Sequence, residues 1–250
     1  MRYEMAPLAI ESDRSERAAF IRRTYAHLAG AILAFIAIET LIFGALIPHV
    51  DGFERALIGA LAHPYSWLIV MVAFIGVSYL ANYWAFNGGS PGLQYAGLGL
   101  YVVAEALIFV PLLYVAIIVL PRVSGDANAG MNIVGQAGIL TLCLFAGLTS
   151  VVFLTGKDFS FLGPIISIAS FVALGVILCA ILFPGGLFSL GLWFSVAMIV
   201  LAAASILYST SNIAYKFRTD QHVAAALSLF ASVALLFYYV LLALMQAQRR

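Results

Sequence analysis

Charged residues are scarce in this sequence. Only 9% of its 250 residues are charged, whereas a soluble domain carries about a quarter. Acidic and basic residues nearly cancel, leaving a formal net charge of +1, so the chain has no global field that would attract nucleic acid. The scarcity of charge excludes water as the main solvent, and its balance argues against a nucleic-acid partner.

Residues in the arrangements that usually build catalytic and metal sites are also scarce. Cys143 and Cys179 both lie within long apolar runs, where they behave as small hydrophobes rather than as a disulfide or metal clip. Every aspartate lies in the N-terminal tail or in a loop, and no histidine stands deep in an apolar run beside a nucleophile. Zinc-enzyme spacing and a complete glycine-rich phosphate loop are also missing. The sequence therefore predicts no enzymatic activity, no metal and no cofactor.

Apolar residues dominate instead, at 64% of the chain. A helix needs about 20 of them in succession to cross a bilayer. Seven stretches meet this requirement: 24–47, 65–86, 93–120, 132–155, 160–183, 187–211 and 223–245. The prediction is an all-α polytopic protein of the lipid bilayer with seven transmembrane helices, and a short interfacial helix at about 53–61 in the first loop.

The remaining residues predict the domain organisation and the topology. Residues 1–23 are expected to form a retained cytoplasmic tail, because they contain no apolar core followed by a cleavage site. Residues 24–250 then form one transmembrane domain. Eight Lys/Arg fall on the face that carries this tail and four on the other face. By the positive-inside rule, the N-terminus is cytoplasmic and the C-terminus lies outside.

Two carboxylates are predicted to lie near mid-membrane. Glu39 stands in the first span and Glu105 in the third, and spans of odd number run in the same direction. We therefore expect both at a similar depth, facing one interior cavity that takes a cation or a proton. In the alternative interpretation, each acid is protonated and simply donates a hydrogen bond to a neighbour.

The last two spans each carry a stripe of small polar residues at helical spacing. The stripes are Ser205, Ser209 and Asn212 on the sixth span, and Ala224, Ser228 and Ser232 on the seventh. Small residues let helix backbones approach, so ordinary helix packing is the favoured interpretation. A hydrated path lined by hydroxyls is the alternative.

A short turn joins the fourth and fifth spans. It contains Lys157 and Asp158, and Asp158 is suited to cap the helix that follows. The pair has the composition of a solvated tight turn, and it is also a candidate contact for a cytoplasmic partner, as are Arg22 and Arg23 in the tail.

Three stretches resemble the Bax inhibitor-1 family, in its bacterial YccA-like branch. They are residues 20–25, residues 154–163 with the run Lys-Asp-Phe-Ser-Phe-Leu-Gly at 157–163, and residues 207–212 followed by 226–237. Their order and spacing match over nearly the whole chain. The resemblance implies six helices around a central seventh, no enzymatic activity and a bacterial inner (plasma) membrane.

The resemblance also implies two roles. Family members act as pH-sensitive calcium leaks that limit cell-death signalling, and the YccA-like branch restrains a membrane-bound ATP-dependent protease. The leak relies on a shared proton between two aspartates, on the sixth and seventh helices. This sequence has Ser209 and Ser232 at those places, and hydroxyls do not titrate in the physiological range.

Two hypotheses follow. In the first, the protein is a membrane regulator, active in protein quality control or stress, that binds another membrane protein such as a protease through Arg22, Arg23, Lys157 and Asp158. In the second, it is a calcium or cation leak whose acids are Glu39 and Glu105, with Ser209 and Ser232 on the path. The missing aspartates favour the first.

Overall fold

The computed structural model of the chain describes residues 6–49, 52–62, 64–87, 90–183 and 190–248. Within them, seven helical segments are long and apolar enough to cross a membrane, which confirms the predicted seven spans. Parts of the sequence-based prediction lie outside the described residues: the first five residues of the tail, the turn at 184–186 and the start of the sixth span at 187.

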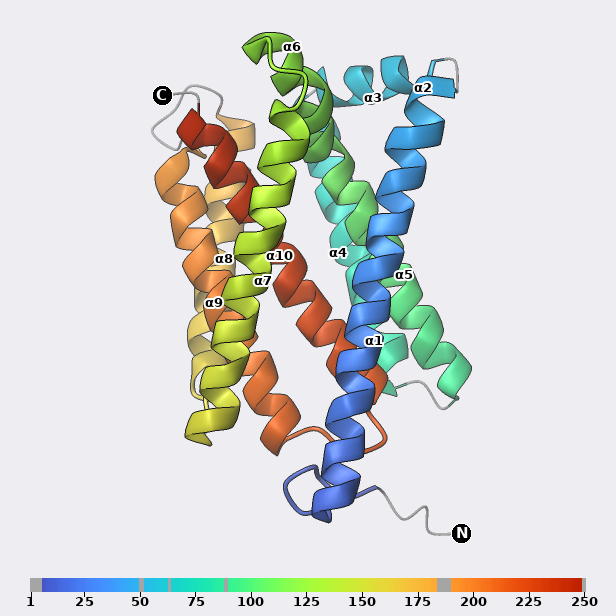
Figure 1. Cartoon of the computed structure of the whole chain (residues 1–250), viewed down its shortest axis with the longest axis vertical. Coiled ribbons are helices and arrows are strands. Elements are labelled where there is room, and N and C mark those ends of the chain that lie inside the picture. The colour runs from blue at the N-terminus through green and yellow to red at the C-terminus, as the bar shows by residue number, and fades with distance from the viewer. Residues whose placement is uncertain (1–5, 50–51, 63, 88–89, 184–189, 249–250) are drawn as a thin grey trace.

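Helices account for nearly all of the described structure (Figure 1). The first span joins α1 (Arg14–Leu41), a π-helical turn (Ile42–Leu46) and α2 (Ile47–His49). The third joins α5 (Pro91–Tyr114), a second π-helical turn (Val115–Val119) and α6 (Leu120–Ser124). The other helices are α3 (Phe53–Ala62), α4 (Pro64–Asn87), α7 (Ala129–Thr155), α8 (Leu162–Leu182), α9 (Leu192–Tyr215) and α10 (His222–Gln248). The predicted short helix in the first loop is α3.

The largest boundary difference lies at the N-terminus. The first helix begins at Arg14 rather than at residue 24, so Arg22 and Arg23 lie on α1 and not in an extended tail. Residues 14–23 contain four Arg, two Ala and one Glu, which favour helix, and their charges keep the segment from being an apolar run. A search for apolar runs does not detect such a polar helical extension.

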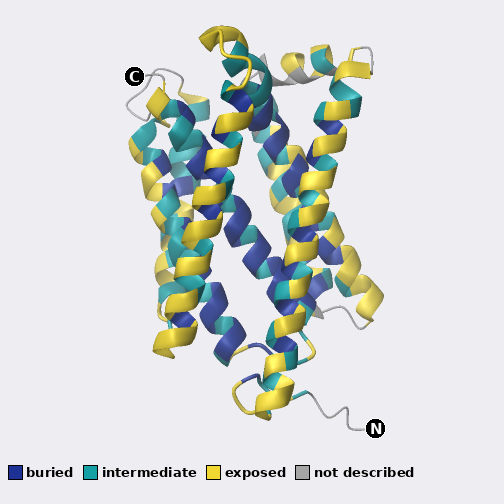
Figure 2. Ribbon diagram, viewed as in Figure 1, coloured by how far each residue is buried: buried dark blue, intermediate teal, exposed yellow. Residues whose placement is uncertain are grey.

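The seventh span, α10, forms the centre of the bundle (Figures 1 and 2). It packs against α9, α1, α7, α5 and α4, while α8 packs mainly on α9 and α4. Its first turns are fully buried from Val223 to Leu227, and three successive alanines there let neighbouring helices come close. The predicted arrangement around a central seventh helix is confirmed.

Close helix approach also explains one buried glycine. A Cβ built on Gly97 of α5 would lie 2.6 Å from the carbonyl oxygen of Ala81 in α4. Only glycine fits there, because any side chain would push the two helices apart. The antiparallel α4 and α5 are thereby held in direct backbone contact.

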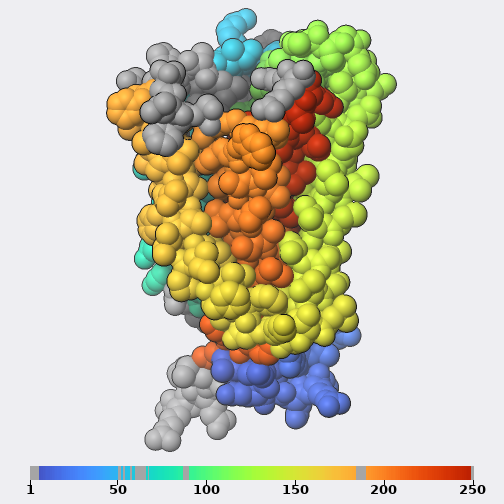
Figure 3. Space-filling view, turned by 90° about the vertical axis from the view of Figure 1, so that its left-hand side faces the viewer, coloured from blue at the N-terminus to red at the C-terminus, as the bar shows by residue number. Residues whose placement is uncertain are grey.

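The outer surface of the bundle is apolar, as expected for a protein surrounded by lipid. Figure 3 shows the face that α8 and α9 form beside α7. Large side chains are exposed on these helices, among them Phe171 of α8 at 74% and Trp193 of α9 at 79%. In water such a surface would be costly, so the fold itself requires a bilayer.

Candidate functional site

The predicted polar stripes of α9 and α10 meet inside the bundle. The hydroxyl oxygens of Ser209 and Ser232 lie 3.4 Å apart, and each residue is only 7% exposed. The Ser232 hydroxyl donates to the carbonyl of Ser228 at 3.0 Å, so the Ser209 hydroxyl is the donor of the pair. Two other stripe members, Ser205 and Ser228, also donate to carbonyls one turn back in their own helices. The contact between the stripes is a closed, hydrogen-bonded seam.

Glu105 also has a partner. The Tyr101 hydroxyl, one turn earlier on α5, donates to its carboxylate at 3.3 Å, and both residues are 7% exposed. Glu39 differs, because neither of its buried carboxylate oxygens has a hydrogen-bond partner, although the residue is just as buried.

The cavity beside Glu39 does not include Glu105. Phe35, one turn before Glu39 on α1, and Phe109, one turn after Glu105 on α5, pack edge to face with ring centroids 5.0 Å apart. Glu39 lines a cavity of about 610 Å³ between α1, α5, α7 and α10, and Glu105 does not line it. This cavity is therefore not the common site that we expected for the two acids.

The turn between α7 and α8 is tied to the end of α9. Asp158 accepts hydrogen bonds from the Ser160 backbone N–H at 2.8 Å and from the Ser211 hydroxyl at 3.0 Å. These bonds, those from Ser160 first, lower the pKa of the Asp158 carboxyl. Asp158 was expected to cap α8, and that expectation is wrong. Phe161 occupies the N-cap position, so Asp158 instead orders the turn in front of it.

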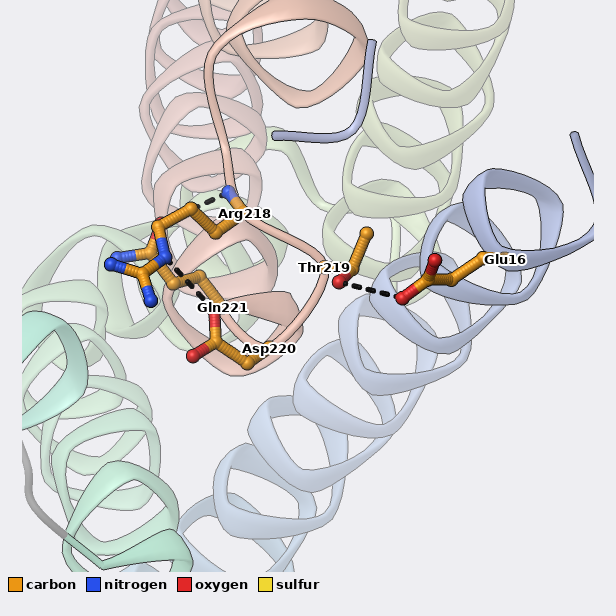
Figure 4. A network of polar contacts seen from close by, with 5 residues as sticks. All are labelled: Glu16, Arg218, Thr219, Asp220 and Gln221. Atoms are coloured by element: carbon orange, nitrogen blue, oxygen red, sulfur yellow. Dashed lines mark hydrogen bonds and ion pairs between the residues drawn. The ribbon is translucent and has the colours of Figure 1, made fainter. Parts of the chain in front are cut away.

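The N-terminal segment is docked on the loop between α9 and α10. The backbone N–H of Ala9 donates to the carbonyl of Phe217 at 2.8 Å, and that of Thr219 donates to Pro7 at 3.2 Å. Figure 4 shows the side-chain part of this contact, in which the Thr219 hydroxyl donates to Glu16 at 3.1 Å.

Two further contacts complete this network. Within the same loop, Arg218 lies 3.6 Å from Asp220 and its backbone N–H bonds to Gln221 (Figure 4). The Tyr215 hydroxyl donates to the carbonyl of Gly156, which links the loop to the end of α7. The three segments therefore form one connected surface, which we call the polar end: residues 6–23, 156–161 and 215–221.

The predicted partner-contact residues all belong to the polar end. Arg22, Arg23, Lys157 and Asp158 are exposed on it. No sequence pattern indicated the docked N-terminal segment, because Glu16 and Thr219 are 203 residues apart. None indicated Thr141 of α7 either, a buried threonine without a partner that lines the same cavity as Glu39.

Metal binding has no visible site among the described residues. No group of three or more His, Cys, Asp or Glu side chains comes together there. Calcium takes about six to eight oxygen ligands, and neither buried glutamate belongs to such a group within that part of the chain.

The comparison with known families agrees with this architecture. The family model described as inhibitor of apoptosis-promoting Bax1 matches residues 17–250. The chain belongs to this family. The Bax1 inhibitor match includes both serines of the seam, both buried glutamates and the polar end from residue 17 onward.

Individual relatives come from plants and bacteria. Protein LIFEGUARD 4 of Arabidopsis thaliana is 28% identical over 94% of this chain and 87% of its own length. An uncharacterized protein of Pseudomonas aeruginosa is 29% identical over 92% of this chain and 90% of its own. A BI1-like protein of Arabidopsis thaliana is 33% identical over 46% of each chain. No solved structure matches the chain at comparable significance.

Proposed function

We propose that this Bax1-inhibitor family member is a non-enzymatic membrane regulator that binds another membrane protein through its polar end. The observation that carries the proposal is the ordered state of that surface. Three segments far apart in sequence are held together by backbone and side-chain hydrogen bonds. A surface that is ordered before binding loses less conformational entropy when a partner docks.

The charges of the polar end suit such a contact. Arg22, Arg23 and Lys157 are exposed, and all three stand on ordered segments. Charged groups on a fixed frame steer association and discriminate between partners more than they add affinity. A partner with an acidic surface close to the membrane is therefore favoured, such as the membrane-bound protease that the family resemblance implies.

A groove within the membrane lies next to the polar end. It measures about 470 Å³ and runs between α1 and α5. Ala26, Gly30 and Ala34 line it at four-residue spacing on α1, opposite Gly99 of α5. Small residues at this spacing let a further transmembrane helix approach closely. The groove provides room for a partner's helix directly beside the exposed arginines.

The polar end is proposed to face the cytoplasm of a bacterial inner membrane. Its described Lys/Arg residues outnumber those at the opposite end, which are Arg55 and Arg122. The family match to a bacterial protein supports this location. The excess of positive charge favours retention on the cytoplasmic side.

Photocrosslinking in native membranes tests the proposal. A photoreactive residue replaces Arg22 or Lys157, and the same residue at Arg122, whose side chain is 68% exposed at the other end, serves as control. We expect a reproducible adduct with one membrane protein from the first two positions only. Equal adducts from all three positions, or none from Arg22 and Lys157, would contradict the proposal.

Matched variants separate the two parts of the surface. Arg22→Glu with Arg23→Glu is expected to abolish the adduct formed from Lys157, whereas Arg122→Glu leaves it intact. Gly30→Leu is expected to weaken it by filling the groove. Gly76→Leu on α4 is its control, since a Cβ at either glycine meets no atom within 4 Å. An unchanged adduct in all four variants would remove both the arginines and the groove from the interface.

A calcium or proton leak is the second candidate, favoured by one observation. Glu39 is a buried, unpartnered carboxyl beside a cavity of about 610 Å³, where a cation would relieve its isolation. Flux into liposomes holding the purified protein tests it, with Glu39→Gln compared against Glu105→Gln. A leak requires a flux that Glu39→Gln removes. Flux no greater than that of empty liposomes rules the leak out.

A further inference from the structure

The cavity beside Glu39 has an unusual lining. It is bounded by α1, the third span, α7 and α10, and its walls are almost entirely apolar. Five phenylalanines line it: Phe35, Phe43, Phe109, Phe230 and Phe237. A volume of about 610 Å³ lies within the range of cavities that hold small organic ligands. The lining suits a molecule with a large apolar body.

The cavity opens sideways, between α1 and α7. Ile36 on α1, and Met131 and Leu142 on α7, line it and are 51%, 63% and 56% exposed. In Figure 1 the central α10 is visible between these two helices. Because the exposed surface of the spans faces lipid, a ligand would enter from the bilayer and not from water.

Two polar groups in this apolar wall have no partner. Both carboxylate oxygens of Glu39 and the hydroxyl of Thr141 are buried without a hydrogen bond. They stand on α1 and α7, on the two sides of the opening, and the residues are 7% and 3% exposed. Buried polar groups are nearly always hydrogen-bonded, and the described residues supply no partner to these two.

The chemistry of the two groups defines that partner. A carboxylate accepts hydrogen bonds on both oxygens, and a threonine hydroxyl accepts as well as donates. A primary ammonium group carries three N–H donors, enough for both oxygens of Glu39 and the oxygen of Thr141. A lipid ester carbonyl only accepts, so it leaves at least one Glu39 oxygen without a donor. The surrounding phenylalanine rings also attract a cation through their faces.

We propose that this cavity binds a membrane-dissolved primary amine with a long apolar body, its ammonium group between Glu39 and Thr141. The Glu39 oxygens are buried in the cavity wall, and turning them toward a ligand breaks no hydrogen bond, because they make none. One carboxylate in an apolar cavity matches a single organic cation. It does not match a metal ion that needs several oxygen ligands.

Binding of dodecylamine to the purified full chain in nanodiscs tests this, followed by native mass spectrometry and thermal unfolding. Three relatives of the probe share its apolar chain and can be compared on the unaltered protein. Dodecanol lacks the charge, dodecyltrimethylammonium keeps the charge without N–H donors, and dodecanoate reverses the charge. We expect dodecylamine to bind at least tenfold more tightly than each of them. Equal binding of dodecylamine and dodecanol would overturn the proposal.

Variants locate the amine on the protein. Glu39→Gln is expected to weaken dodecylamine binding at least tenfold, Thr141→Val a few-fold, and Ile36→Trp to block the lateral opening. Glu105→Gln is the matched control and is expected to bind as the native chain does. Dodecylamine binding unchanged by both Glu39→Gln and Thr141→Val would show that the amine binds elsewhere and would refute the site. The outcome does not depend on any protein partner at the polar end.

Discussion

Two helix contacts in this protein contrast sharply. Along the seam between α9 and α10, the Ser209 and Ser232 hydroxyls are hydrogen-bonded, and Ala202 and Ile206 of α9 are fully buried. Between α1 and α7, a cavity is open to the lipid, and Glu39 and Thr141 have no partners. The contact between α9 and α10 is packed and its hydroxyls are hydrogen-bonded. The contact between α1 and α7 leaves a cavity and two polar groups without partners.

The contrast sets a satisfied contact beside one that leaves two polar groups without partners. At the seam, the hydroxyls of Ser209 and Ser232 satisfy each other. A single acid stands instead on the lipid side of the bundle. The seam therefore stabilises the fold, and the cavity is the part that is free to accept a ligand.

The largest expected effect comes from placing a larger side chain in the seam and, for comparison, in the cavity. Ser209→Leu inserts a branched side chain into the packed seam and should lower the free energy of unfolding by about 3 kcal/mol. Thr141→Leu extends into the cavity and removes an unsatisfied hydroxyl, so it should be neutral or stabilising. Thermal unfolding in detergent measures both. Similar losses in the two variants would mean that the cavity is as tightly packed as the seam.

Replacing each of the two buried acids with leucine should change the free energy of unfolding in opposite directions. Glu39→Leu removes a carboxyl that has no partner, and without any ligand present it should stabilise the protein by about 1–2 kcal/mol. Glu105→Leu leaves the buried Tyr101 hydroxyl without its acceptor and should destabilise by a similar amount. Unfolding curves recorded side by side decide this. A loss of stability in Glu39→Leu would indicate that Glu39 already has a partner.

A smaller effect is expected from removing one hydroxyl of the seam. Ser232→Ala deletes the acceptor of the buried Ser209 hydroxyl and should cost about 1 kcal/mol. Ser228→Ala, one turn away, removes only a bond to its own helix and should cost less. Equal unfolding temperatures for these two variants would show that the serine pair adds nothing to the seam.

The smallest expected effect is a pH dependence of the stability, caused by Asp158 beside the end of α9. Hydrogen bonds from Ser160 and Ser211 lower the pKa of Asp158 in the folded state, so its ionised form stabilises the fold above the unfolded pKa, about 4. This contribution is lost as the pH falls through the lower folded-state pKa. Asp158→Asn should therefore unfold slightly earlier than the native chain at pH 7, and the difference should vanish in acid. A difference independent of pH would assign the effect to geometry instead of charge.

Sequence patterns predicted the fold well because transmembrane helices are encoded locally. Each span needs its own run of apolar residues, so all seven, and the short α3, were visible without any tertiary information. The polar start of α1 at residues 14–23 escaped the same criterion, since helix-forming residues there are not apolar. Cavities that several helices line were harder to predict, since the cavity beside Glu39 does not include Glu105.

The candidate sites depend on contacts that no local pattern encodes. Small polar stripes predicted the meeting of Ser209 and Ser232, because helical spacing places them on one face. Glu39 has no hydrogen-bond partner because a cavity separates α1 from α7. The spacing of these two helices is a tertiary feature that no local pattern encodes. Thr141 resembles any other threonine in a span until that cavity is seen.

The pairing of the N-terminal segment with the loop between α9 and α10 also bears on how the chain is made. Pro7, Ala9 and Glu16 hydrogen-bond to residues 217–219, which leave the ribosome some 200 residues later. The polar end is consequently completed after six spans have been synthesised. A truncated or wrongly inserted chain would lack it, so only a protein that has finished its insertion would present this surface.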